Sequence, residues 1–147
     1  MTRSKRMEPI KQLASDRERE AATQVELARR ALDDHERQLA QLRQYRAEYA
    51  ERVSKAAAPD VARLQNFHAF LARLSDAIAQ QERAVAEALA TLERATDSWR
   101  ERRIEAASIG RAVAKIATGE RRAEDRRAQR DADERALQNV HRSRDGG

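Results

Sequence analysis

The chain has 147 residues, of which 37% are charged and only 3% are aromatic, and it contains no cysteine, which excludes disulfides and thiolate metal sites. The 30 basic and 25 acidic residues leave a net charge of +5, which describes a mixed surface rather than a basic face. With four glycines and two prolines in an alanine- and arginine-rich sequence, the composition is typical of long helices in thin contact, not of a thick globular core.

The first element that the sequence predicts is a long helix over residues 9–55, preceded by a flexible basic leader over residues 1–8. Pro9 suits the first turn of a helix, where its missing N–H costs nothing. In the second half of this helix apolar residues return in a heptad pattern whose polar members are His35 and Arg46. So long a helix with a narrow apolar stripe is expected to pack against another helix.

A turn is expected at residues 56–60, because Pro59 disfavours helix at Ala58. Asp60 can then cap a second helix, expected over residues 61–141. So short a connection makes the helices antiparallel neighbours, and residues that face each other then have numbers that add up to about 116 to 118. The sequence therefore predicts an all-α fold, in which two long helices form an antiparallel coiled-coil hairpin and the second helix is longer.

The strongest periodic signal runs from Leu64 to Ile116, where an apolar residue returns alternately every three and four positions. Gln81 and Arg102 interrupt it, and polar residues at such positions fix the register of a coiled coil at some cost in stability. From about residue 120 the same positions become charged, so this extension has no apolar face to bury. Residues 142–147 are expected to be a disordered tail.

Catalysis finds no support in the sequence. The histidines His35, His68 and His141 lie far apart, and no glycine-rich phosphate loop, metal-ligand spacing or nucleophile motif is present. A pair of helices also offers no concave pocket that excludes water. We expect neither an enzyme nor a cofactor or metal site.

The sequence also lacks the features of a secreted or membrane-spanning chain. No apolar core of a signal peptide follows the basic N-terminal residues. No uncharged run approaches the roughly 18 to 20 residues that a membrane span needs. We therefore expect a soluble, cytoplasmic protein.

Two matching stripes of residues lie near the turn, with the same i, i+4, i+7, i+11 spacing on each helix. In a chain so poor in aromatic residues, the tyrosines and phenylalanines gathered here favour a surface that contacts a partner. The alternative is that the rings thicken a thin core. The aromatic stripes consist of Gln38, Leu42, Tyr45 and Tyr49 on the first helix and Phe70, Leu74, Ala77 and Gln81 on the second.

The arginines beyond residue 120 raise the question of nucleic-acid binding. Acidic residues interleave with these arginines, and no aromatic stacking platform accompanies them. A solvated helix is the simpler interpretation, and an acidic protein surface is a better partner for it than a phosphate backbone. We therefore expect no nucleic-acid partner.

Three segments resemble the FliJ family of flagellar export proteins: LRQYRAEY at 42–49, NFHAFLARLSDAI at 66–78 and DSWRERR at 97–103. The resemblance implies a component of the type III export apparatus at the base of the bacterial flagellum, with the same succession of helix, turn and longer helix. FliJ-like proteins bind the ring of the export ATPase FliI, contact the export gate protein FlhA and escort export chaperones. The resemblance thus also implies peripheral association with the cytoplasmic face of the inner membrane.

The resemblance also implies where partners bind. The gate-contacting positions of the family correspond to the eight residues of the aromatic stripes, although Gln81 stands where a histidine is familiar in the family. We further expect residues near both termini to face the ATPase ring, namely Ile10, Leu13, Arg121, Arg122, Arg126 and Arg127. Two alternatives remain open: the stalk protein of a virulence-type III secretion system, and a generic coiled-coil scaffold or dimer that buries its thin apolar strip against another copy.

Overall fold

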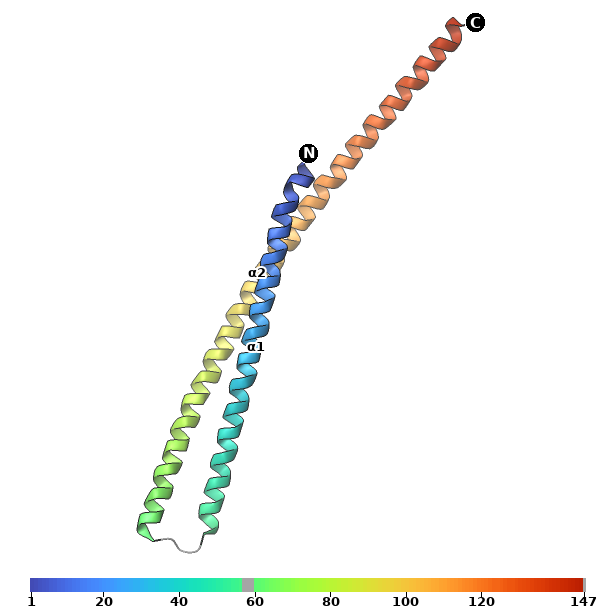
Figure 1. The fold of residues 1–147 in the computed structure, drawn as a ribbon. Coiled ribbons are helices and arrows are strands. Elements are labelled where there is room, and N and C mark those ends of the chain that lie inside the picture. The colour runs from blue at the N-terminus through green and yellow to red at the C-terminus, as the bar shows by residue number, and fades with distance from the viewer. Residues whose placement is uncertain (57–59, 147) are drawn as a thin grey trace. The chain divides into compact units, whose positions relative to one another are not determined.

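Two long helices make up the described part of the chain. The computed structural model describes residues 1–56 and 60–146, and within them lie α1 (Arg3–Lys55, 53 residues) and α2 (Val61–Asp145, 85 residues) (Figure 1). The expected all-α fold, a hairpin of two helices with the second one longer, is confirmed.

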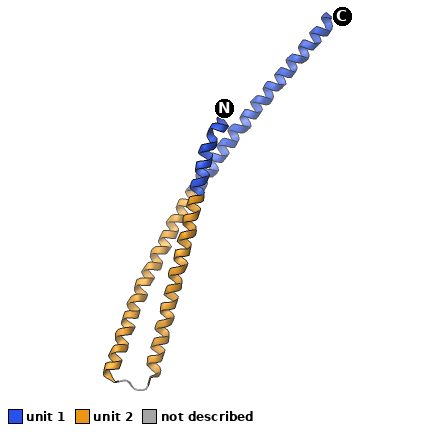
Figure 2. Ribbon diagram, viewed as in Figure 1, with its two compact units in different colours: residues 1–18, 102–147 blue, residues 19–101 orange. Residues whose placement is uncertain are grey.

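The pairing of the helices divides the chain into two compact units (Figure 2). Unit 1 consists of residues 1–18 and 102–147, and unit 2 consists of residues 19–101. In each unit a segment of α1 runs antiparallel to a segment of α2 (Figure 1). Neither described helix is long and apolar enough to cross a bilayer.

The helix α1 begins at Arg3 rather than at the expected Pro9, so the predicted leader over residues 1–8 is mostly helical. Thr2 caps this end, because its hydroxyl accepts a hydrogen bond from the backbone N–H of Lys5 at 3.3 Å. Pro9 lies inside the helix. The proline removes one backbone N–H donor there without ending the helix.

The helix α2 begins at Val61, as expected, and Asp60 caps it. The Oδ1 atom of Asp60 accepts a hydrogen bond of 2.8 Å from the backbone N–H of Arg63, which is the predicted capping interaction. The rest of the expected turn, including the predicted break at Ala58 and Pro59, lies outside the described residues.

The C-terminal end of α2 differs from the sequence prediction. α2 continues to Asp145 rather than ending at 141, so residues 142–145 are helical where a disordered tail was expected. Arg142 and Arg144 lie in this last turn, where positive charge complements the negative end of the helix dipole.

The core of unit 2 is the predicted heptad seam. Leu32, Leu39 and Leu74 are each less than one tenth exposed. The predicted register is also found here, because Tyr49 packs against Phe67 and His35 hydrogen-bonds with Gln81, and in both pairs the residue numbers add up to 116. Burial is modest, as expected for a two-helix contact.

In unit 1 the register differs from the prediction. Ser4 hydrogen-bonds with Glu120, so this end of α1 pairs with residues further along α2 than a sum of about 116 to 118 predicts. The seam there includes Ala14 on α1 and Val113 on α2, which are 6% and 4% exposed. From residue 124 onward every described residue of α2 is exposed, in agreement with the predicted charged extension.

Candidate protein-docking surface

Four aromatic rings from the two helices meet at the end of unit 2 near the turn. The ring of Tyr49 lies 4.6 Å from that of Phe70 and 6.0 Å from that of Phe67, and Tyr45 lies 6.3 Å from Phe70. All three contacts are edge-on, the geometry that aromatic pairs prefer. The structure therefore brings the two predicted aromatic stripes together, one from each helix.

The eight residues of the stripes differ in how much of their surface a partner could reach. Leu74 is buried, with 7% exposure, and belongs to the seam, whereas Tyr45 is 44% exposed. Gln38 is exposed as well. The remaining five are half-buried, namely Leu42, Tyr49, Phe70, Ala77 and Gln81. Spacing predicts which side of a helix a residue faces, but not how deeply the neighbouring helix covers it.

An open groove of about 380 Å³ lies beside the aromatic rings. It is lined by Gln38, Gln41, Leu42, Tyr45 and Gln81, so four of its five lining residues belong to the predicted stripes. These side chains offer ring edge, aliphatic surface and amide groups, and none of them is charged. This groove, with the exposed side chain of Tyr45, is called the docking surface below.

A polar layer crosses the seam at one end of the docking surface. The Nε2 atom of Gln81 lies 3.1 Å from His35 Nδ1, 3.0 Å from the carbonyl oxygen of His35 and 3.2 Å from Gln38 Oε1. The Gln81 amide thus pairs with the half-buried His35 inside the seam, which is how a polar seam residue fixes register. His35 itself is half-buried and hydrogen-bonded within the seam.

The opposite flank of the helix pair is bridged by polar contacts. Arg43 and Glu82 form an ion pair of 3.2 Å between α1 and α2, and Arg46 Nε donates a hydrogen bond of 3.0 Å to Ser75 Oγ. The heptad places Arg43 and Glu82 on the other side of the seam from Tyr45 and Phe70. The two flanks of unit 2 therefore differ in chemistry, with amide and aromatic groups on one and charged groups on the other.

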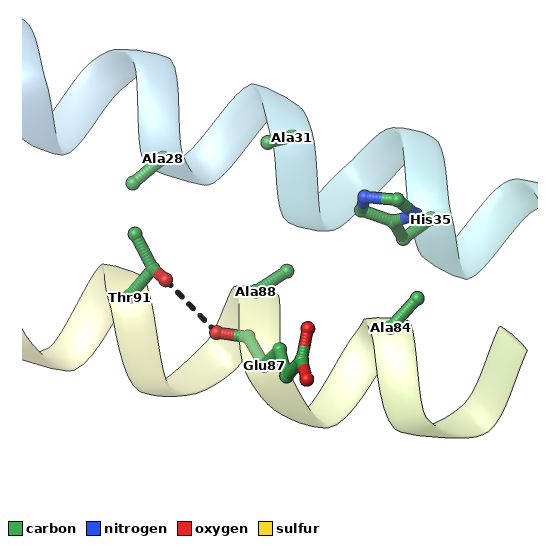
Figure 3. A pocket seen from close by; sticks show the side chains of 7 residues that line it. All are labelled: Ala28, Ala31, His35, Ala84, Glu87, Ala88 and Thr91. Carbon is green, nitrogen blue, oxygen red and sulfur yellow. Dashed lines mark hydrogen bonds between the residues drawn. The ribbon is translucent and has the colours of Figure 1, made fainter. Parts of the chain in front are cut away.

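A second groove, of about 300 Å³, continues from His35 away from the rings (Figure 3). Small side chains of both helices face each other across it, with His35 at one end. Its lining residues are Ala28, Ala31, His35, Ala84, Glu87, Ala88 and Thr91. The Thr91 hydroxyl donates to the backbone carbonyl of Glu87 at 3.0 Å, so it is already satisfied within α2.

The two grooves differ in their ionisable lining residues, which include His35 and Glu87 in the second groove. The charged residue of the second groove is Glu87, and the docking surface has none among its lining residues. Within residues 1–56 and 60–146, no group of three or more histidine, cysteine, aspartate or glutamate side chains could hold a metal ion.

The residues expected to face the ATPase ring all lie in unit 1 and are all exposed, with Ile10 at 52% and Leu13 at 50% exposure on α1. The arginines at 121, 122, 126 and 127 follow Glu120 on α2. Glu120 accepts hydrogen bonds from the Ser4 hydroxyl at 2.6 Å and from the Ser4 backbone N–H at 3.0 Å. These two bonds, the side-chain one first, lower the pKa of Glu120.

Sequence reasoning treated His35 and Gln81 as separate polar interruptions and missed that they pair. A signal for this pairing was present, because each residue interrupts the seam of its own helix and their numbers add up to a value within the predicted register. Two polar residues that meet across an apolar seam are expected to hydrogen-bond with each other.

The paired helices, the docking surface beside their aromatic rings and the exposed extension of α2 define a coiled-coil interaction protein. The chain belongs to the flagellar FliJ protein family, whose model matches residues 3–145. It is accordingly a flagellar export-associated stalk protein of a type III secretion system, and its family is a non-enzymatic, structural one. Comparisons with curated proteins and with solved structures gave no match.

Proposed function

We propose that this chain is a stalk that binds the export gate protein FlhA through its docking surface and the ring of the export ATPase FliI through residues near its termini. In this role it also escorts export chaperones and associates peripherally with the inner membrane through the export apparatus. The observation that carries the proposal is the docking surface itself, an uncharged groove with an exposed tyrosine at its rim.

The composition of the docking surface supports a protein partner. Tyrosine is enriched among the residues that dominate binding energy, because it offers a large rigid ring together with a polar hydroxyl. The Tyr45 ring packs edge-on against Phe70, a contact that limits its motion before a partner binds. A side chain ordered in advance loses little conformational entropy on binding.

The gate contact is tested with Tyr45→Ala, because Tyr45 is the most exposed ring of the cluster and its removal leaves the seam intact. We expect the affinity for the cytoplasmic domain of FlhA, measured by isothermal titration calorimetry, to fall about tenfold or more, the loss typical of a binding hot spot. The unfolding midpoint should stay close to that of the wild type.

The matched control is Arg43→Ala, which removes an exposed ion pair on the opposite flank of the same unit. This variant should bind FlhA as tightly as the wild type. Equal loss of affinity in both variants, or undiminished binding by Tyr45→Ala, would show that the docking surface is not where the gate binds.

The ATPase contact is tested by truncating the chain after Ala123, because this removes the exposed extension but keeps Glu120 and its contact with Ser4. We expect weaker stimulation of FliI ring assembly and ATP hydrolysis, with unchanged FlhA affinity. A second variant, Ile10→Ser with Leu13→Ser, should have the same effect without loss of helicity, since both side chains are half exposed. If these variants lost gate binding alone, the gate rather than the ATPase ring would bind near the termini.

A self-associating coiled coil is the competing interpretation, and exposed Leu137 and Val140 on the extension favour it. Sedimentation equilibrium at micromolar concentration separates the two. A monomer is expected for an independent stalk, whereas a stable dimer that disappears on truncation after Ala123 would favour the scaffold.

A further inference from the structure

We propose that His35 is a positioning residue of the docking surface, and that protonation of its imidazole reverses the hydrogen-bond polarity that Gln38 presents to a partner. The inference rests on the proposed role of the docking surface in binding the export gate. It adds a chemical requirement for the partner and a dependence of binding on pH.

The hydrogen bonds of the polar layer can form with only one protonation state of His35. An amide nitrogen can only donate, so the contact of 3.1 Å between Gln81 Nε2 and His35 Nδ1 requires Nδ1 to be the acceptor. The imidazole is then neutral and carries its proton on Nε2. The two N–H groups of Gln81 serve His35 Nδ1, the His35 carbonyl and Gln38 Oε1, so one of them is shared.

Protonation makes this arrangement impossible, because Nδ1–H and the Gln81 amide would then be two donors facing each other. To keep a bond, Gln81 must turn its amide so that Oε1 accepts from Nδ1–H. The Gln81 bond to the His35 carbonyl oxygen is then lost, because two oxygens would face each other there, and the Oε1 atom of Gln81 faces the position that Gln38 Oε1 occupies. Two acceptors cannot bond, so Gln38 must turn its amide as well and donate from Nε2.

The rotation of the Gln38 amide changes the docking surface, because Gln38 and Gln81 line the groove together with Tyr45. While His35 is neutral, the Gln81 amide donates a hydrogen bond to Gln38 Oε1, so the NH₂ group of Gln38 is available to donate to a partner. After protonation the partner meets Gln38 Oε1 instead. A partner that binds the neutral form therefore supplies an acceptor, such as a carbonyl or carboxylate oxygen, opposite Gln38.

The charges around His35 do not oppose protonation of its imidazole. The residues of α1 one turn away, Ala31, Leu32 and Leu39, are uncharged, and the charged residue that shares a groove with His35 on α2 is Glu87 (Figure 3). No cation among these neighbours opposes a positive imidazole. Histidine is also the side chain that ordinarily changes charge between about pH 5 and pH 8.

The first experiment needs no partner. In ¹⁵N-labelled protein, the side-chain NH₂ resonances of Gln81 and Gln38 should shift between about pH 8 and pH 5 together with the His35 ring signals. The shift should be absent in His35→Gln, which cannot titrate in this range, and present in His68→Gln, which removes an exposed histidine elsewhere in unit 2. If the NH₂ resonances of Gln81 and Gln38 in the wild type did not shift together with the His35 ring signals, the inference would be overturned.

The second experiment measures the affinity for the cytoplasmic domain of FlhA at about pH 7.5 and pH 5.5. We expect the wild type and His68→Gln to lose about three- to tenfold more affinity on acidification than His35→Gln, the effect of one hydrogen bond. Titration of FlhA itself cancels in this comparison.

The two experiments separate the inference from the proposed function. Absence of FlhA binding at pH 7.5 contradicts the proposed function, and the amide titration then decides alone whether His35 positions Gln38. Binding with the same pH ratio in the wild type and His35→Gln overturns the inference and leaves the proposed function standing.

Discussion

The ring of Tyr49 lies 4.6 Å from the ring of Phe70, at an interplanar angle of 62°. Tyr49 also contacts Phe67 and is half-buried, whereas Tyr45 contacts Phe70 alone among the described ring pairs and is 44% exposed. The two tyrosines therefore have different roles. Tyr49 joins α1 to α2 near the turn, and Tyr45 is available to a partner.

We expect Tyr49→Ala to lower the free energy of unfolding by about 2 to 4 kcal/mol, because it removes two ring contacts and leaves a cavity between the helices. Tyr45→Ala should cost less than about 1 kcal/mol, since much of its ring is already in water. Urea unfolding followed by circular dichroism measures both values. Tyr49→Phe keeps the ring and serves as the control; equal costs for the two alanine variants would contradict the assignment.

Much of the fold could be predicted because a heptad is a local pattern repeated many times. The seam, the start of α2 at Val61 and the cap at Asp60 all follow from residues close together in the sequence. The start of α1 at Arg3 did not follow, and its first turn contains a contact between Ser4 and Glu120, which lie far apart in the chain. The same contact lies outside the predicted register.

The candidate site was predicted in outline, since helical spacing places the aromatic stripes on matching faces. Which residues of the stripes are buried and which are exposed was not predicted, because Leu74 and Tyr45 fit the same spacing. Leu74 is buried and Tyr45 is exposed. Burial depends on the size of the facing side chains and on the exact crossing of the helices. Neither is encoded in the spacing of one stripe.

The cap of α2 gives a second prediction. Asp60 Oδ1 accepts from the backbone N–H of Arg63, a donor that would otherwise lack a partner within the helix. Asp60→Ala should lower the free energy of unfolding by about 1 kcal/mol, and Asp60→Asn, which still accepts this bond, by less than half as much. Thermal unfolding measures the difference, and an alanine variant as stable as the asparagine variant would show that the cap contributes nothing.

A third prediction concerns the two glycines inside α2. A Cβ atom added at Gly110 or Gly119 would have nothing within 4 Å, apart from the helix itself. Each substitution to alanine should therefore raise the free energy of unfolding by up to about 1 kcal/mol, because alanine loses less backbone entropy in a helix. Thermal unfolding checks this, because the variant with both substitutions should unfold at a higher temperature than either single variant. A fall would mean that α2 needs to bend there.

The last prediction follows from the contact between Ser4 and Glu120, which holds the first turn of α1 against α2. The hydrogen bonds from the Ser4 hydroxyl and then from its backbone N–H lower the pKa of Glu120 from its ordinary value of 4.5. A carboxylate with a lowered pKa contributes its stabilisation fully above the ordinary value and loses it as the pH falls through the lowered one. At neutral pH the contact is therefore intact, and acid releases it.

Glu120→Gln should reproduce the acid effect at neutral pH, because a neutral amide is a weaker acceptor than a carboxylate. We expect the protection of the Ser4 amide against hydrogen exchange, corrected for the intrinsic rate, to fall several-fold in this variant, and in the wild type only on acidification below the ordinary pKa. Glu124→Gln, one turn further along the exposed extension, is the control and should leave that protection unchanged. Equal protection in Glu120→Gln and the wild type at neutral pH would mean that the start of α1 is held by Thr2 and the seam rather than by Glu120.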